Sequence, residues 1–323
     1  MQRILALVLP AFILAAPLAA QEPAMRELAL KAGQNDPQAI AALEKAAEGG
    51  SPEAAYYVGE LHLRGAVKPL DPGRAIEWFE RAAQQGHVVA MYALGVVYER
   101  SEPPLRDFAR ALAWYRKAAE RNDARAQRNL GYFMQEGRGA AQDLKEAREW
   151  YERAAAQGDA RAKYLLGMLY YDGRGVDRDD ARAVDLFRQA SDQEIPEALY
   201  RLALMYGTGR GVPRDESTAV ELVRKAAQKG NADAQYYLAG AYARGLAGLP
   251  KDEPRALGWL VRAAEQEHVE AQYALALTYT EGRGVPVNPQ EALNWMERAA
   301  RNGHAQAIDL LARSRTRPPP ATQ

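Results

Sequence analysis

The sequence predicts an all-α solenoid of stacked helix-turn-helix units, and three observations carry this prediction. An Ala-Ala pair recurs at steps of 36 residues along most of the chain. All five tryptophans occupy one position of that repeat. Glycines and helix-capping residues recur at fixed places between the apolar segments. A unit of this length is typical of paired helices that bury their apolar faces against neighbouring units.

The Ala pairs define the second helix of each unit, expected for example over residues 143–156. They begin at residues 46, 82, 118, 154, 226, 263 and 299, with Ala190-Ser191 in the gap, and one step is of 37 residues. Each Trp lies four residues before the first Ala, which places ring and methyl on one helix face. We therefore expect the tryptophans in the core of the repeat: Trp78, Trp114, Trp150, Trp259 and Trp295.

Apolar residues at spacings of three and four predict an amphipathic first helix in each unit, for example over residues 162–172. A small residue follows the central Leu of this helix. A glycine inside a helix costs about 0.5–1 kcal/mol relative to Ala, so its presence indicates the close approach of a neighbouring helix. Core glycines are accordingly expected at Gly95, Gly131 and Gly167.

The turn between the two helices carries a Gly-Arg-Gly motif in four units, at 137–139, 173–175, 209–211 and 282–284. A glycine directly after a helix predicts a left-handed C-cap. A phosphate-binding loop would instead open a helix and carry a downstream Lys, so we reject that interpretation. Several residues later an acidic or amide residue recurs where the second helix needs an N-cap, and this role explains the series without a metal site. Its members are Asp71, Asp107, Asp143, Asp179, Asp215, Asp252 and Asn288.

The repeat divides the chain into five segments. Residues 1–20 are predicted as a signal peptide, 21–49 as N-terminal capping helices, and 50–303 as seven repeats of about 36 residues. Residues 304–314 are expected to form a C-terminal capping helix. Residues 315–323 contain three consecutive prolines without apolar periodicity and are predicted to be a disordered tail.

The N-terminus predicts export. Arg3 precedes an apolar run that ends in small residues, with cleavage expected after Ala20. The run is short for a membrane span, and an uncleaved N-terminal anchor is the alternative. The chain has no Cys, which excludes disulfides and a lipid-modified cysteine. We expect a periplasmic or secreted protein without a stable membrane span after cleavage.

The repeat resembles the Sel1-like repeat, a relative of the tetratricopeptide repeat. Residues 164–176, followed by Asp179 and Ala183, show its pattern, with Leu186 in place of the usual Trp. The resemblance covers about residues 28–313. It implies a right-handed superhelix of paired helices, in a family whose members act as adaptors. One branch of the family carries a Cys pair in every repeat and has been associated with β-lactams, and the lack of Cys makes that branch a poor match.

Catalytic candidates are few, and we expect no enzyme activity, cofactor or metal. The histidines are spread along the repeat, with His87, His268 and His304 in turns between units. No Ser begins a Ser-x-x-Lys motif and no His-Glu-x-x-His motif occurs. A carboxylate pair brought together by the fold stays an open possibility. The balance of 42 basic and 42 acidic residues argues against a nucleic-acid partner.

Partner binding is expected on the concave face, which the first helices line in repeats of this kind. The second, fifth, ninth and twelfth positions of these helices should face the groove. The tyrosines at the fifth position could instead pack between repeats, and the apolar side chains at the ninth could be covered by neighbours. The predicted binding residues are Tyr92, Val96, Arg128, Tyr132, Tyr164, Met168, Tyr200 and Leu204.

These expectations describe a periplasmic or secreted adaptor that holds a protein or peptide in its groove. Regulation of envelope signalling or of polysaccharide-related assembly is the role we expect from the resemblance. Two alternatives remain at this point, a secreted factor that acts on a host cell and a cell-wall-active hydrolase of the β-lactamase-like repeat type.

Overall fold

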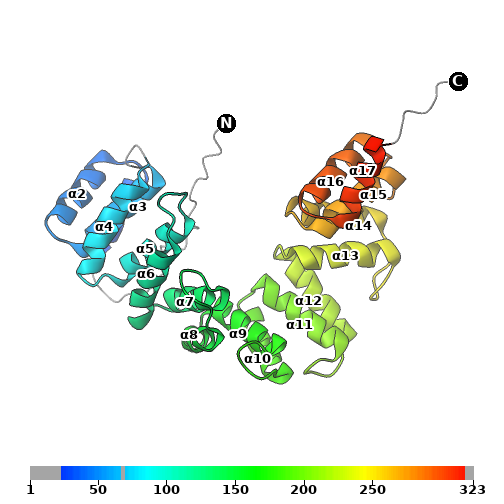
Figure 1. Ribbon diagram of the computed structural model, residues 1–323, viewed down its shortest axis with the longest axis horizontal. Coiled ribbons are helices and arrows are strands. Elements are labelled where there is room, and N and C mark those ends of the chain that lie inside the picture. The colour runs from blue at the N-terminus through cyan, green and yellow to red at the C-terminus, as the bar shows by residue number, and fades with distance from the viewer. Residues whose placement is uncertain (1–22, 67–69, 317–323) are drawn as a thin grey trace. The chain divides into compact units, whose positions relative to one another are not determined.

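The computed structural model describes residues 23–66 and 70–316, and these residues form seventeen α-helices with no β-strand among them (Figure 1). The predicted all-α class is confirmed. The predicted signal peptide lies outside the described residues, and so does the tail from residue 317 onward. None of the described helices is both long enough and apolar enough to cross a bilayer.

Seven helical pairs follow two N-terminal helices, α1 (Pro23–Gly33) and α2 (Pro37–Glu48). The first helices of the pairs are α3 (Pro52–Arg64), α5 (Val88–Arg100), α7 (Ala124–Glu136), α9 (Ala160–Asp172), α11 (Pro196–Thr208), α13 (Ala232–Arg244) and α15 (Val269–Glu281). The second helices are α4 (Pro72–Gln84), α6 (Phe108–Glu120), α8 (Leu144–Ala156), α10 (Asp180–Ser191), α12 (Glu216–Gln228), α14 (Glu253–Glu265) and α16 (Pro289–Arg301). The last helix, α17 (Ala305–Thr316), extends past residue 314, where its end was expected.

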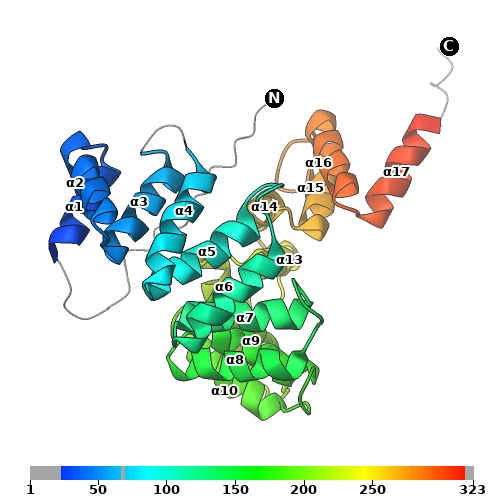
Figure 2. The same cartoon turned by 60° about the vertical axis from the view of Figure 1, so that its left-hand side comes forward.

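The helices group into two compact units, one ending at Ala162 and the other beginning at Lys163. Within the first unit, α3 packs on α4, α5 on α6 and α7 on α8, and each pair also contacts the next (Figure 2). Within the second unit, α11 with α12, α13 with α14 and α15 with α16 form the same arrangement. Within each unit, the two helices of a hairpin therefore bury their apolar faces against each other and against the neighbouring hairpin.

The caps predicted from the sequence are confirmed at both ends of the helices. At the start of each second helix, a side-chain oxygen accepts the backbone N–H three residues on, at 3.0 Å for Asp71 and 2.9 Å for Asp143. The same bond occurs at the remaining members of the series. At the end of the first helices, Gly137 and Gly209 adopt φ values of 65° and 73°, the left-handed conformation that a C-cap requires.

In four of the seven hairpins an aromatic ring of the second helix packs against a glycine of the first helix. Tyr115 and Tyr151 are completely buried, and a Cβ atom added to Gly95 or Gly131 would lie 2.5 Å or 2.7 Å from their respective rings. In the second unit, Phe187 lies against Gly167 in the same way. The predicted core glycines are thus the positions at which the two helices of a hairpin meet.

The structure refines the place of the tryptophans. Trp150 is buried at 7% exposure, whereas the other four are half-buried, and Trp259 and Trp295 pack against a core cluster. The residue after the Trp is buried in four of these five helices, and Met296 is half-buried. Each indole is covered by a cation three residues further along its own helix, an arrangement that allows a cation–π contact. The distances to the ring centroids are 4.4 Å for Arg81, 3.9 Å for Lys117, 4.5 Å for Arg153, 4.7 Å for Arg262 and 4.3 Å for Arg298.

Candidate partner-binding surface

The tyrosines at the fifth position of the first helices contact residues of their own hairpin or of the next one. Tyr56 stacks on His87, with ring centroids 5.1 Å apart, and Tyr273 stacks on His304 at 4.1 Å. Tyr236 lies 4.8 Å from His268. These three tyrosine rings therefore pack between repeats, which is one of the two roles that the sequence allowed for the fifth position.

The three turn histidines act as N-caps. The Nδ1 atom of His87 accepts the backbone N–H of Ala90 at 3.1 Å, and His268 and His304 make the equivalent bond. This bond needs a neutral imidazole, because a protonated Nδ1 is a donor only. Burial lowers the pKa of His87 to about 4, which favours the neutral form.

In the N-terminal unit, the predicted binding face is largely filled by its own side chains. Val96 is buried at 3% exposure, and the Arg125 guanidinium covers the Tyr92 ring at 4.6 Å. Arg128 is paired with Asp159 at 2.7 Å, in a position where both side chains are mostly buried. A cavity of about 10 Å³ beside Tyr92 has room for little more than one water molecule.

Two further groups on this face are also engaged within the unit. Tyr132 accepts a hydrogen bond from Arg138 at 3.2 Å, and the Arg138 guanidinium lies 5.0 Å from its ring centre. Glu60 is buried and accepts the Tyr56 hydroxyl at 2.7 Å. Burial raises the pKa of Glu60 although this hydrogen bond opposes the shift. Because of these contacts, the side chains on the first-helix face of the N-terminal unit are packed against one another.

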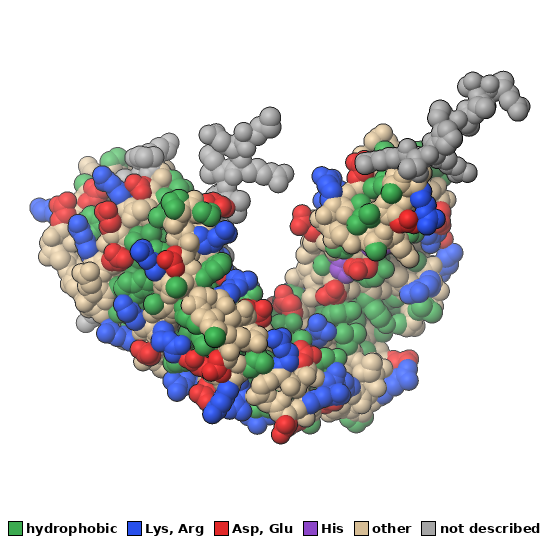
Figure 3. Space-filling model, in the orientation of Figure 1, with side chains coloured by type: hydrophobic (Ala, Val, Ile, Leu, Met, Phe, Trp, Pro, Cys, Tyr) green, Lys and Arg blue, Asp and Glu red, His purple; other side chains and the backbone are tan. Residues whose placement is uncertain are grey.

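The C-terminal unit carries a hollow of about 670 Å³ between α13 and α15, with residues of α14 and of the preceding loop along it. This volume falls in the range that holds small-molecule or peptide ligands. Hydrophobic side chains gather around α13 on the face shown in Figure 3, with acidic and basic side chains at their margins. The lining includes Tyr200, Tyr236, Tyr237, Leu257, Leu260 and Leu277 as its main apolar and aromatic surfaces.

The hollow exists where one first helix lacks a side chain. The ninth position of the first helices holds Leu204 in α11 and Leu277 in α15, but Gly240 in α13. A Cβ added to Gly240 would meet only the end of the Arg244 side chain, at 3.3 Å. Packing therefore does not require this glycine, in contrast with Gly167, and the end of the Arg244 side chain takes part of the space that a larger residue would fill.

The charged groups of the hollow differ in how they are paired. Lys251 pairs with Glu253 at 2.9 Å, and Arg283 pairs with Glu281 at 2.7 Å. Asp233 lies 3.4 Å from His268. Arg244 donates through Nε to the carbonyl oxygen of Gly240 at 3.2 Å, and no carboxylate within the described part of the chain pairs with it. Its guanidinium thus has donors left for a ligand.

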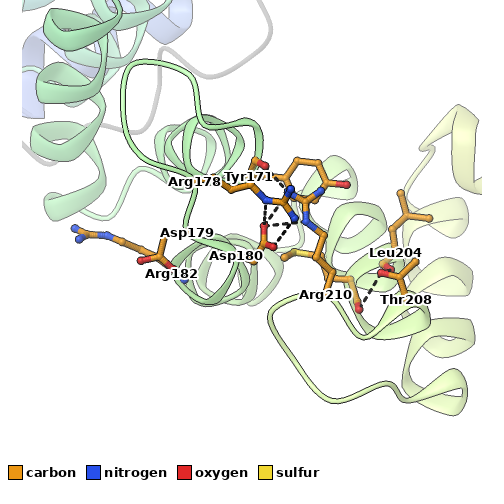
Figure 4. Close-up of polar contacts among 9 residues, drawn as sticks. Tyr171, Arg178, Asp179, Asp180, Arg182, Leu204, Thr208 and Arg210 are labelled. Carbon is orange, nitrogen blue, oxygen red and sulfur yellow. Dashed lines mark hydrogen bonds and ion pairs between the residues drawn. The ribbon is translucent and has the colours of Figure 1, made fainter.

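A second polar cluster, drawn in Figure 4, is a joint between repeats rather than a cleft. Arg210, the central residue of one Gly-Arg-Gly turn, reaches back to the preceding hairpin, where it pairs with Asp180 at 2.7 Å and lies 3.5 Å from the Tyr171 ring centre. Hydrogen bonds from Arg178 and then Arg210 hold the pKa of Asp180 well below its usual range. A Cβ on Gly211 would lie 2.5 Å from the Asp180 carbonyl oxygen, so the second glycine lets the turn dock.

The structure distributes the predicted binding residues over both units. Tyr92 and Val96 line the small cavity of the N-terminal unit, and Tyr200 lines the large hollow. Tyr164, Met168 and Leu204 are half-buried on helices α9 and α11. The sequence analysis did not select Gly240, although it is the one residue without a side chain in a mostly apolar series at the ninth position. It also missed Arg244 and the exposed Tyr237, which hold positions outside the four that were considered.

Comparison with known proteins identifies the class to which this architecture belongs. The Sel1 repeat family matches seven consecutive segments, which are residues 52–87, 88–123, 124–159, 160–194, 196–231, 232–268 and 269–304. These matches follow the helical pairs of the structure. The chain is a member of the Sel1 repeat family, whose fold is typical of protein-interaction scaffolds.

Solved structures of similar proteins agree. A Sel1 repeat protein from Oxalobacter formigenes is 31% identical, with 91% of each chain covered and a TM-score of 0.71. The protein c5321, described as a protective antigen present in uropathogenic Escherichia coli strains, is 32% identical with a TM-score of 0.70. The match to c5321 covers 85% of this chain but only 58% of that protein. The immunity protein PA5088 from Pseudomonas aeruginosa, at 21% identity and a TM-score of 0.50, shares the fold. No curated protein matches the chain.

Proposed function

We propose that this protein is an exported, non-catalytic adaptor that binds a protein partner through the first-helix face of its repeats. The observation that carries the proposal is the hollow of about 670 Å³ on α13 and α15. The hollow lies on the face that the sequence predicted for binding. Its lining includes Tyr237, whose side chain is 41% exposed. Exposed aromatic groups beside a concave surface are typical of partner anchors.

The N-terminal sequence supports a location outside the cytoplasm for the adaptor. A positively charged residue, an apolar run and small residues before Gln21 support export to the periplasm. A role in envelope signalling or polysaccharide-related assembly would place the partner among envelope proteins. Fractionation of cells that express the full chain, with N-terminal sequencing of the mature protein, tests this part.

Affinity capture tests the binding role. The mature wild-type chain is used to recover partners from an envelope extract, and Tyr237→Glu serves as the matched variant, because its exposed side chain can be changed without disturbing the core. We expect a specific envelope protein that wild type retains and the variant loses. Recovery of the same proteins by both chains, or of none by wild type, contradicts the proposal.

A secreted factor that acts on a host cell is a second candidate, favoured by the similarity to the protective antigen c5321. It differs from the first candidate in location rather than in chemistry. The mature chain in the culture medium would support the second candidate, and its retention with periplasmic markers would support the first.

A further inference from the structure

We infer that the hollow beside Gly240 is an anchor site for a peptide segment in which a large apolar side chain adjoins an Asp or Glu. The inference rests on the proposed binding function and gives it a ligand chemistry. It depends on three features of the C-terminal unit, which are the space at Gly240, the apolar wall around it and the unpaired guanidinium of Arg244.

The space at Gly240 has the character of an anchor pocket. Every other first helix of the seven pairs presents a side chain at this position, whereas α13 presents none. Leu277 of α15 and Leu257 and Leu260 of α14 line the same hollow. A bulky apolar group of a ligand would enter the hollow beside the Arg244 guanidinium and remove this apolar surface from water.

Arg244 supplies the polar half of the site. It lies four residues after Gly240 on the same helix, so both occupy one helix face. Its Nε is directed at the Gly240 carbonyl oxygen at 3.2 Å, and a terminal nitrogen lies 3.3 Å from the place of an added Cβ, so the guanidinium lies within the space that the missing side chain leaves. A planar guanidinium binds a carboxylate through two parallel hydrogen bonds, the arrangement that most favours this partner.

The other charged side chains of the hollow lie close to partners of opposite charge or to His268. Lys251 and Arg283 already have carboxylate partners from this chain, and these exposed pairs contribute little specificity. Asp233 and Glu253 also line the hollow, so the guanidinium of Arg244 is the feature that selects an acidic segment. The lining reaches from Tyr200 of α11 to Leu277 of α15, so an internal segment of a longer chain can pass through.

The test uses a phage library of random peptides selected on the purified mature chain. We expect recovered sequences to share a large apolar residue next to Asp or Glu. A representative peptide, labelled with a fluorophore, is then titrated by fluorescence polarisation against four chains: wild type, Gly240→Leu, Arg244→Gln and the control Gly258→Leu. Gly258 lies in α14 with no atom near its added Cβ and does not line the hollow.

The expected pattern is specific to the two residues. Gly240→Leu fills the gap and reduces the affinity at least tenfold, and Arg244→Gln reduces it about tenfold by removing a charge-assisted hydrogen bond. Gly258→Leu leaves the affinity within about twofold of wild type. Replacing the peptide's acidic residue by its amide should lower the affinity for wild type by as much as Arg244→Gln does. The same replacement should lower the affinity for the Arg244→Gln variant only slightly, because the partner of the carboxylate is already gone.

Folding of the variants is checked by far-UV circular dichroism and thermal unfolding. Gly240→Leu should fold, because only a movable arginine end lies near the added Cβ. The inference is overturned if no common sequence is recovered, if acidic and amide peptides bind alike, or if Gly258→Leu weakens binding as Gly240→Leu does.

The same variants distinguish this inference from the proposed function. An envelope partner that wild type and Gly240→Leu capture equally would leave the adaptor role in place and overturn the anchor site. Selected peptides that depend on Gly240 and Arg244, together with no captured envelope protein, would support the anchor chemistry and contradict the adaptor role.

Discussion

The ring of Tyr151 rests directly on the backbone of Gly131, where a Cβ atom would lie 2.7 Å from Cε1. Because real Cβ atoms do not approach a ring so closely, the two helices of this hairpin, α7 and α8, can meet only if residue 131 has no side chain. Tyr151 is completely buried at this contact, and its hydroxyl donates to the Gln135 side chain at 3.1 Å.

Gly131→Ala is therefore expected to destabilise the protein by about 1–3 kcal/mol, because the methyl group forces the Tyr151 ring or the helix to move. The higher helix propensity of Ala offsets part of this loss, by about 0.5–1 kcal/mol. Urea unfolding followed by circular dichroism measures the difference. Gly258→Ala is the control, since its Cβ meets no atom and the change should be neutral or stabilising. Equal effects of the two substitutions would contradict the packing argument.

Trp150→Ala should lower the free energy of unfolding by about 3–5 kcal/mol, because the indole is 7% exposed and its Nε1 donates to Glu146 at 3.0 Å. Trp114→Ala is expected to cost less, since that indole is only half-buried and lies under Lys117. Denaturant midpoints and slopes of the two variants check the order. A loss below about 1 kcal/mol for Trp150→Ala would show that the ring contributes little to the core.

The N-cap at His87 predicts a loss of stability on acidification. Its pKa is about 4 in the folded protein and about 6.5 in an unfolded chain. Between these values the unfolded state binds more protons, so stability present above pH 6.5 falls as the pH decreases and is lost below pH 4, by about 1–3 kcal/mol in all.

His87→Asn keeps an acceptor for the Ala90 N–H but does not titrate in this range. The unfolding free energy, measured between pH 7 and pH 4, should therefore depend less on pH in this variant than in wild type. An unchanged pH dependence would assign the effect to other groups.

Arg210→Lys should destabilise the C-terminal unit by about 1 kcal/mol. An ammonium cannot reproduce the flat contact with the Tyr171 ring together with the bonds to Asp180 and the Tyr171 carbonyl oxygen. Arg214→Lys is the control, because Arg214 and its partner Glu216 are both largely exposed, and its effect should stay within about 0.5 kcal/mol. Thermal unfolding of the two variants makes the comparison, and equal shifts would argue against a joint at Arg210.

Much of the fold could be predicted because each unit repeats the same local signals. Caps such as Asp143 and Gly137 act within their own helix, so their roles depend on neighbours in the sequence and were confirmed. The direction of Trp114 could not be fixed in this way. Two adjacent aromatic residues at the centre of a helix, Trp114 and Tyr115, both suit a core, and only the approach of Gly95 decides that the tyrosine takes it.

For the candidate site, the sequence predicts a face of the first helices, but it does not predict where on that face a hollow lies. The fifth and ninth positions led to Tyr92, Val96 and Tyr200, yet Val96 is buried while Tyr200 borders an open hollow. The difference depends on contacts between hairpins, such as the cover that Arg125 gives to Tyr92. The spacing of residues in the sequence does not show which side chains of a neighbouring hairpin will lie over a given residue.

The sequence by itself determined the all-α repeat, the phase of its helices and their caps, because these follow from spacings and from bonds between residues close in the chain. The tertiary structure decided which of two adjacent aromatic rings, Trp114 or Tyr115, fills its hairpin, how the Arg210 turn docks on Asp180, and where the hollow lies. Those outcomes depend on residues distant in the chain meeting in space, as Arg210 and Asp180 do at a separation of 30 residues. A glycine such as Gly240 can border a hollow or lie in a filled core, and the side chains that pack around it in the folded protein decide between the two.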